Sequence, residues 1–199
     1  MKIILVGASG DVGRAAYDAL SKRHEIIRAG RKGADITVDI GDRQSIEAMY
    51  ATVGAFDAVV STAGGAHFAP LSDYTEETFR FGLENKAMGQ INLVLAGMSH
   101  VSDNGSFTLT SGVLDRDPVI SGTGAATANG ALAGFIKGAA IELQRGLRIN
   151  VVSPGLLKAS EDRYGALFPG HERVSSERVG RAYAKSVEGA ITGEVIIVA

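Results

Sequence analysis

The stretch that decides the fold is Ile3-Ile4-Leu5-Val6-Gly7-Ala8-Ser9-Gly10-Asp11-Val12-Gly13. Its four leading apolar residues end at a glycine, which predicts a strand buried on both faces of a parallel sheet. The glycines that follow allow a tight turn. The backbone of this turn can approach a pyrophosphate, which binds at the N-terminus of the next helix. The spacing is G-x-x-G-x-x-G rather than the G-x-G-x-x-G of the dinucleotide-binding fingerprint. The prediction of a dinucleotide site therefore depends on where the glycines lie, between a first strand and a first helix. A tight turn without a ligand is the alternative.

Short apolar strands alternate with helical stretches along the rest of the chain. Strands are predicted over 25–29, 37–38, 58–60, 107–110, 149–152 and 195–198, and helices over 12–20, 43–53, 75–98, 124–145 and 176–188. This alternation indicates βαβ units in one domain spanning residues 1–199. We therefore expect an α/β fold of the Rossmann type, a doubly wound parallel sheet of about seven strands in the order 3-2-1-4-5-6-7, with helices on both faces. Ligands of such sheets bind beyond the carboxyl ends of the strands.

Composition and charge exclude several classes of function. The net charge is −2 and charged residues make up 21 % of the chain, so we expect neither nucleic acid nor an anionic membrane as a partner. Cysteine is absent, which excludes disulfides and thiolate chemistry and is compatible with a cytoplasmic setting. The four histidines are scattered and predict no metal site. We expect neither a signal peptide nor a membrane-spanning segment.

The end of the second strand indicates which dinucleotide binds. Sites that prefer NAD place an acidic residue there, whereas an NADP site offers a cation to the 2′-phosphate. Here no carboxylate is present, and Arg31 and Lys32 lie at the expected distance from the glycine turn. The pattern favours NADP(H) over NAD(H), with Arg31 as the phosphate ligand. A solvated Arg-Lys pair is the alternative.

Other residues at strand ends are predicted to complete the cofactor site. Asp39 could accept a hydrogen bond from the adenine amino group while Ile40 packs on the ring, or Asp39 could merely cap the next turn. The small residues Ala63 and Gly64 let a cofactor pass close to the backbone. The predicted cofactor-binding residues are Gly7, Ser9, Gly10, Asp11, Val12, Gly13, Arg31, Asp39, Ile40, Ala63, Gly64, Pro154 and Gly155.

The chain resembles the short-chain dehydrogenases/reductases along almost its whole length. The matching pieces, in the family's order, are the glycine turn, Asp39-Ile40, Thr62-Ala63-Gly64, Asn85, Thr110-Ser111-Gly112, Asn150 to Gly155, and Ile191 to Val195. The resemblance implies that Ser111 polarises a substrate carbonyl and that Asn85 organises a proton-relay water. It also implies that Pro154-Gly155 turns over the nicotinamide.

The resemblance fails at the family's Tyr and Lys. Aligning Leu132, Gly134 and Phe135 with the family pattern puts Ala125 at the Tyr position and Asn129 at the Lys position. Ala125 has no proton to give. The Asn129 amide could still hydrogen-bond a ribose hydroxyl, as the family's Lys does, so we keep Asn129 with Ser111 and Asn85 as catalytic candidates.

Two functions therefore stay open. One is an NADP(H)-dependent oxidoreductase for a small carbonyl or alcohol substrate, with His67, an ordered water or a substrate group as the proton donor. The other is an NADP(H)-binding sensor or structural protein without turnover. The other possible donors, Tyr74 and Tyr164, are better explained by packing or surface roles.

A stripe of small residues predicts an assembly. Ala126, Gly130, Gly134 and Gly138 recur every four residues on the helix that carries Ala125. Glycine inside a helix costs about 1 kcal/mol relative to alanine, which suggests a packing reason. The resemblance implies a homodimer or homotetramer through this helix and the long helix before it. Packing of the stripe within the chain itself is the alternative.

Overall fold

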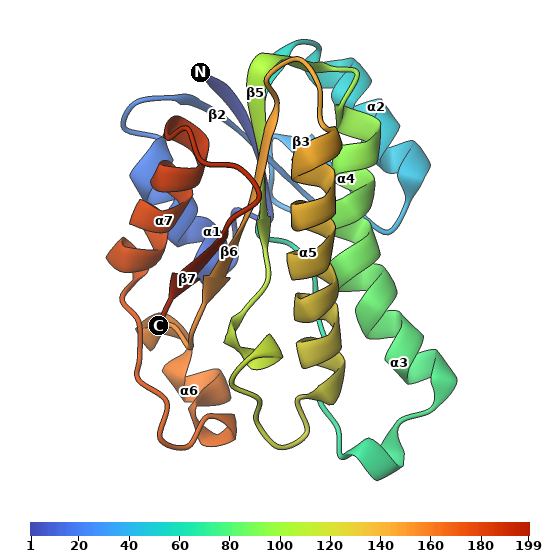
Figure 1. Ribbon diagram of the computed structural model, residues 1–199, viewed down its shortest axis with the longest axis vertical. Helices are drawn as coiled ribbons and strands as arrows, with labels where there is room; N and C mark the ends of the chain where they lie inside the picture. Colours follow the sequence, from blue (N-terminus) through green and yellow to red (C-terminus); the bar gives the residue numbers. More distant parts are fainter.

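The computed structural model describes residues 1–199 and contains one parallel sheet of seven strands in the order β3-β2-β1-β4-β5-β6-β7 (Figure 1). The predicted strand order is confirmed. The strands are β1 Lys2–Val6, β2 Glu25–Gly30, β3 Ile36–Thr37, β4 Phe56–Ser61, β5 Val101–Thr110, β6 Arg148–Pro154 and β7 Val195–Val198. In β1, Ile3 to Val6 are all at most 1 % exposed, as expected of a strand covered on both faces.

Helices cover both faces of the sheet and enclose two hydrophobic cores. On one face lie α1 Asp11–Leu20 and α7 Ser176–Glu188, and on the other lie α2 Arg43–Val53, α4 Gly89–Gly97 and α5 Thr123–Glu142 (Figure 1). The shorter helices α3 Glu76–Gly82 and α6 Glu161–Tyr164 lie beyond the carboxyl ends of the strands (Figure 1). None of the helices combines the length and the apolarity that crossing a bilayer requires.

Local signals explain the helix boundaries that the sequence predicts well. The Asp42 side chain accepts a hydrogen bond of 2.9 Å from the backbone N–H of Gln44 and begins α2, and Gly54, with a φ of 68°, ends it. Ser175 caps α7 in the same way through the N–H of Arg178. Both helices have the predicted bounds.

Several predicted boundaries are wrong, and most of these differ from the structure by one or two residues. The strand predicted over 107–110 begins at Val101, because Val101 pairs with Phe56 across an irregular register, although Asn104 interrupts the extended backbone with a φ of 62°. The helix predicted to end at Arg145 ends at Glu142, because Leu143 is extended and Arg145 and Gly146 have positive φ. The third strand is Ile36–Thr37, one residue earlier than predicted.

The long helix predicted over 75–98 is interrupted by one wide turn. Between α3 and α4, residues Leu83–Met88 form a π-helical turn, which we call the π turn. It packs against α5 and contains Asn85 and Lys86. Such turns occur mostly inside α-helices and often at functional sites.

Candidate functional site

A cavity of about 770 Å³ lies at the carboxyl ends of β1, β2 and β4. Its lining includes Gly7, Ser9, Arg31, Asp39, Ile40, Ala63, Gly64 and Asn85. These residues come from segments that are far apart in the sequence, and the parallel sheet brings them together, as predicted from strand ends. We call this space the larger cavity, and its volume is typical of sites for cofactors.

The glycine turn fits an anion at the N-terminus of α1. Gly7 has a φ of 86°, and a Cβ there would lie 2.8 Å from the backbone nitrogen of Ala63. A Cβ on Gly13 would overlap the Gly7 carbonyl, so both positions require glycine. A Cβ on Gly10, in contrast, would meet no atom closer than 3.7 Å, and no side chain caps α1. The free N–H groups and the open space form a cradle for phosphate.

Cations flank the same cavity at the end of β2. Arg28 is bound to Asp35 at 2.6 Å, and this contact holds the Asp35 pKa down at about 2. Arg31 and Lys32 line the cavity, are exposed and form no ion pair, so their charges are available to a ligand. Asp39 and Ile40 form the adjoining wall. One Asp39 carboxylate oxygen accepts a bond of 2.9 Å from the Gly41 N–H, while Ile40 packs against Gly89.

A second, smaller cavity of about 370 Å³ shares its border at Thr62 to Gly65 with the larger one. Its lining includes Val12, Ser111, Asn129, Pro154 and Gly155. Ser111 is 4 % exposed and Asn129 is 1 % exposed, yet the Ser111 hydroxyl and the Asn129 Oδ1 have no hydrogen-bond partner within the protein. Buried polar atoms are nearly always satisfied, so these two indicate a ligand or water in the smaller cavity.

Lys86 is the only charged side chain that lines the smaller cavity, and the sequence reasoning missed it. Its Nζ donates a hydrogen bond of 3.1 Å to the backbone carbonyl of Ser111. Burial lowers the pKa of Lys86 to about 8, and the negative charge of Asp115 partly opposes that shift. The only sequence signal was a lysine next to Asn85, and helical spacing could not orient it because the π turn changes the spacing.

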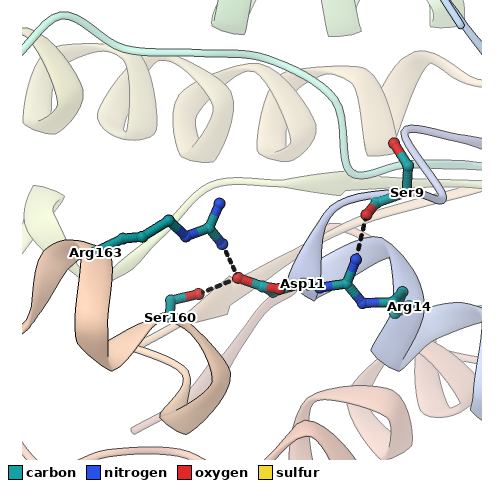
Figure 2. Close-up of polar contacts among 5 residues, drawn as sticks. All are labelled: Ser9, Asp11, Arg14, Ser160 and Arg163. Carbon is teal, nitrogen blue, oxygen red and sulfur yellow. Dashed lines mark hydrogen bonds and ion pairs between the residues drawn. The ribbon is translucent and has the colours of Figure 1, made fainter.

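Asp11 joins the first turn of α1 to the segment that borders the smaller cavity. The Ser160 hydroxyl donates a bond of 2.7 Å to its carboxylate, and Arg163 and Arg14 also contact it (Figure 2). The Ser160 hydrogen bond, ahead of the two guanidinium charges, holds the Asp11 pKa below its usual value. The Asp11 side chain is therefore engaged within the protein, which leaves its backbone for the cofactor role predicted from the sequence.

Comparison with known proteins agrees with this geometry. A family model described as enoyl-(acyl carrier protein) reductase matches residues 9–198. An uncharacterised oxidoreductase of Methylorubrum extorquens is 28 % identical over 198 residues, covering 85 % of this chain and 77 % of its own.

The chain is a member of the short-chain dehydrogenase/reductase family.

Solved structures show the same family fold. A Listeria innocua protein superposes with a TM-score of 0.98 at 49 % identity, covering 100 % of both chains. A small-chain dehydrogenase in complex with NADPH superposes with a TM-score of 0.86 at 27 % identity, covering 100 % of this chain and 96 % of its own. The expected Rossmann-type fold is confirmed.

The structure places the remaining candidates of this short-chain dehydrogenase/reductase relative to the cavities. Ala125 is buried beside Val113 and Leu114, and it lines the smaller cavity together with Asn129. Asn85 lines the larger cavity, and its Nδ2 donates 3.0 Å to the Phe81 carbonyl.

The alternative proton donors are less well placed. His67 and Tyr74 line neither cavity, and their rings pack edge-on, 5.4 Å apart. Tyr164 lines the smaller cavity but is 42 % exposed.

Proposed function

We propose that the protein is an NADP(H)-dependent oxidoreductase acting on a small carbonyl or alcohol substrate. The observation that carries this proposal is that the two cavities are adjacent and share Thr62 to Gly65: a cleft with phosphate-binding features borders a pocket where the Ser111 hydroxyl and Asn129 Oδ1 lack partners. When bound, the reduced nicotinamide supplies a hydride. The Ser111 hydroxyl donates to the substrate oxygen, since a donor aimed at developing negative charge stabilises the transition state.

The residues of the larger cavity support binding of the phosphorylated dinucleotide. The free N–H groups at the start of α1 bind the pyrophosphate, and Arg31 and Lys32 bind the 2′-phosphate. Asn129 hydrogen-bonds a ribose hydroxyl from the floor of the smaller cavity. The 27 % identical structure in complex with NADPH supports the same cofactor class.

The apolar wall of the smaller cavity restricts the substrate. Leu114, Leu156 and Phe168 face it from three different segments, and the volume of about 370 Å³ suits a small molecule. We infer a small ketone, aldehyde or secondary alcohol with a compact apolar body.

Ala125 favours a second candidate, an NADP(H)-binding protein without turnover. It is 2 % exposed and offers no polar atom where the resemblance predicts a tyrosine. Such a protein would bind the cofactor for sensing or for structural stability.

The experiment that tests the proposal compares binding and turnover in the unmodified protein. Thermal shift with NADPH and with NADH measures binding, and loss of NADPH absorbance with 9,10-phenanthrenequinone and diacetyl measures reduction. We expect a larger shift with NADPH and reduction of at least one of the two probes. Binding without reduction favours the second candidate, and no binding of either dinucleotide contradicts both.

We also propose that the protein forms a homodimer or homotetramer through α5. A Cβ added to Gly130, Gly134 or Gly138 meets no atom within 4 Å, so packing within the chain does not explain the glycine stripe. Ile141, on the same helix, is 86 % exposed. An open glycine stripe lets a helix of a second copy approach closely.

A further inference from the structure

The protein has a cationic side chain where the substrate of the proposed reaction would bind. Lys86 is the only charged residue lining the smaller cavity, which it shares with Ser111 and Asn129. We propose that Lys86 is the catalytic proton donor and acceptor, and that its ε-ammonium protonates the oxygen of a bound carbonyl substrate. This inference rests on the proposed function.

The hydrogen bonding of Lys86 leaves donors for a ligand. A lysine ammonium carries three N–H donors, and the structure gives Nζ one partner, the Ser111 carbonyl at 3.1 Å. Lys86 forms no ion pair, unlike Arg28 or Arg163. Two donors therefore remain beside the residue whose unpartnered hydroxyl is expected to hold the substrate oxygen.

The backbone around Lys86 holds it in this position. Lys86 lies in the π turn, which packs against α5, the helix that carries Ala125 and Asn129. Gly64 also lies against Lys86: a Cβ on Gly64 would lie 2.9 Å from the Lys86 Cα and 3.2 Å from the Lys86 Cγ. Only a glycine at position 64 lets the lysine approach the border between the two cavities.

The charge environment makes proton exchange possible near neutral pH. Burial lowers the pKa of Lys86 to about 8. Asp115, in the turn Val113–Asp115, is the charged group that acts on it and raises that pKa. Of the other elements around the cavity, α5 offers only the uncharged Asn129, the segment Thr62 to Gly65 offers no titratable side chain, and α6 offers Tyr164. An acid works best when its pKa is close to the working pH.

The proton step is balanced without a further reactant. In reduction, the hydride from the nicotinamide cofactor forms the C–H bond, an N–H bond of Lys86 breaks, and an O–H bond forms on the substrate. The neutral amine then takes a proton from solvent. In oxidation, the neutral amine takes the hydroxyl proton as the hydride leaves.

The test uses Lys86→Met and Lys86→Arg in the full chain, with Lys185→Met as a matched control on the exposed side of α7. NADPH binding is measured by thermal shift, and kcat and KM with 9,10-phenanthrenequinone across pH. We expect both Lys86 variants to bind NADPH and to lose about 100-fold or more in kcat, because general acids contribute 10²–10⁴-fold. Arginine does not rescue kcat, since its guanidinium stays protonated. The wild-type kcat for reduction falls above about pH 8, and the control keeps wild-type values.

A second readout does not depend on turnover. In protein labelled with ¹³C-lysine, the Lys86 Cε signal, assigned by its loss in Lys86→Arg, is followed across pH with and without NADP⁺. We expect it to titrate at lower pH than the other lysines and to shift when NADP⁺ binds.

The outcomes separate this inference from the proposed function. Wild-type kcat and pH profile in Lys86→Met overturn the inference while the proposed function stands. Loss of kcat in Tyr164→Phe but not in Lys86→Met assigns the proton to Tyr164 and also overturns it. If no probe is reduced, a Lys86 signal that titrates with the other lysines overturns it, and early titration sensitive to NADP⁺ supports it. If the wild-type protein binds no dinucleotide, the proposed function is contradicted, and the inference that rests on it is contradicted too.

Discussion

The Ser160 hydroxyl donates a hydrogen bond of 2.7 Å to the Asp11 carboxylate, which connects two segments far apart in the sequence at the edge of the smaller cavity. Asp11 begins α1 directly after the glycine turn, and Ser160 immediately precedes α6. The segment that borders the substrate site is therefore attached to the helix whose N-terminus is expected to bind the cofactor phosphates. The Ser160–Asp11 hydrogen bond therefore ties the position of one segment to that of the other.

Asp11→Asn is expected to loosen the segment 160–164 and to destabilise the protein by about 2 kcal/mol, because hydrogen bonds to charged groups contribute about 1.5–3 kcal/mol. Since the folded pKa of Asp11 is lowered, this stabilisation is present above the ordinary Asp pKa and is lost as pH falls through the lower folded value. Urea denaturation at pH 7 and pH 3 measures the difference, with the exposed Asp18→Asn as control. Equal stability of Asp11→Asn and wild type at pH 7 contradicts this.

Arg31→Ala is expected to weaken NADPH binding by about tenfold or more and to leave NADH binding unchanged, because only NADPH carries the 2′-phosphate. The estimate follows from the worth of a charge-assisted hydrogen bond, at about 1.4 kcal/mol per factor of ten. Titration calorimetry with both dinucleotides measures the two affinities, and NADH serves as the internal control. An equal loss for both dinucleotides would place Arg31 away from the 2′-phosphate.

Ser111→Ala is expected to reduce turnover without destabilising the cofactor-free protein. The Ser111 hydroxyl is buried without a partner, so replacing it by a methyl hydrogen removes a desolvation cost instead of a bond. We expect an unchanged or higher Tm, together with a fall in kcat of about 100-fold for the reduction probes. A fall in Tm of several degrees shows that the hydroxyl is satisfied inside the protein and contradicts its assignment to the substrate.

Lys86→Met is expected to stabilise the protein below pH 8. The pKa of Lys86 is lowered from 10.5 to about 8, so the folded protein binds fewer protons than the unfolded chain between these values, and wild-type stability rises with pH there. At 1.36 kcal/mol per pKa unit, the gain in Lys86→Met is at most about 3 kcal/mol at pH 6. It is expected to vanish near pH 11. Parallel urea curves at both pH values check the sign, and a variant less stable than wild type at pH 6 refutes it.

Gly134→Leu is expected to disrupt the assembly and to leave the folded monomer intact. The position is open in the monomer, and leucine is a better helix former than glycine by about 1 kcal/mol. Light scattering after gel filtration measures the mass, and circular dichroism checks the fold. Lys185→Leu on α7 is the control, since that helix covers the opposite face of the sheet. An unchanged mass for Gly134→Leu assigns the interface to another face.

The sequence predicts most helices because their signals are local, and it predicts the sheet order because the alternation of strands and helices indicates a doubly wound fold. Asp42 and Ser175 cap their helices, and the apolar run ending at Gly7 is buried as expected. The strand ends also predict which residues gather around the larger cavity. The position of Lys86 is different, since it depends on contacts with Gly64 and Ser111 that lie far away in the sequence. No local pattern distinguishes this lysine from one on a solvated helix face.

The unpartnered atoms were equally beyond prediction. Whether Asn129 hydrogen-bonds within the protein depends on how α5 packs against Gly112, and the resemblance supplied only its position. Asp11 was predicted to bind the cofactor, and the sequence did not indicate that three side chains from two segments contact its carboxylate.

The π turn has a consequence for how this site can change during evolution. Asn85 and Lys86 are neighbours in the sequence, yet Asn85 lines only the larger cavity and Lys86 only the smaller one. A regular α-helix turns by about 100° per residue, and a π turn accommodates one residue more than an α-helical turn. Deleting a single residue just after Lys86 would shift Asn85 to the position of Lys86, so an amide would replace the ammonium group at the smaller cavity. Insertions and deletions, and not only substitutions, can thus change which charged groups line the larger and the smaller cavity.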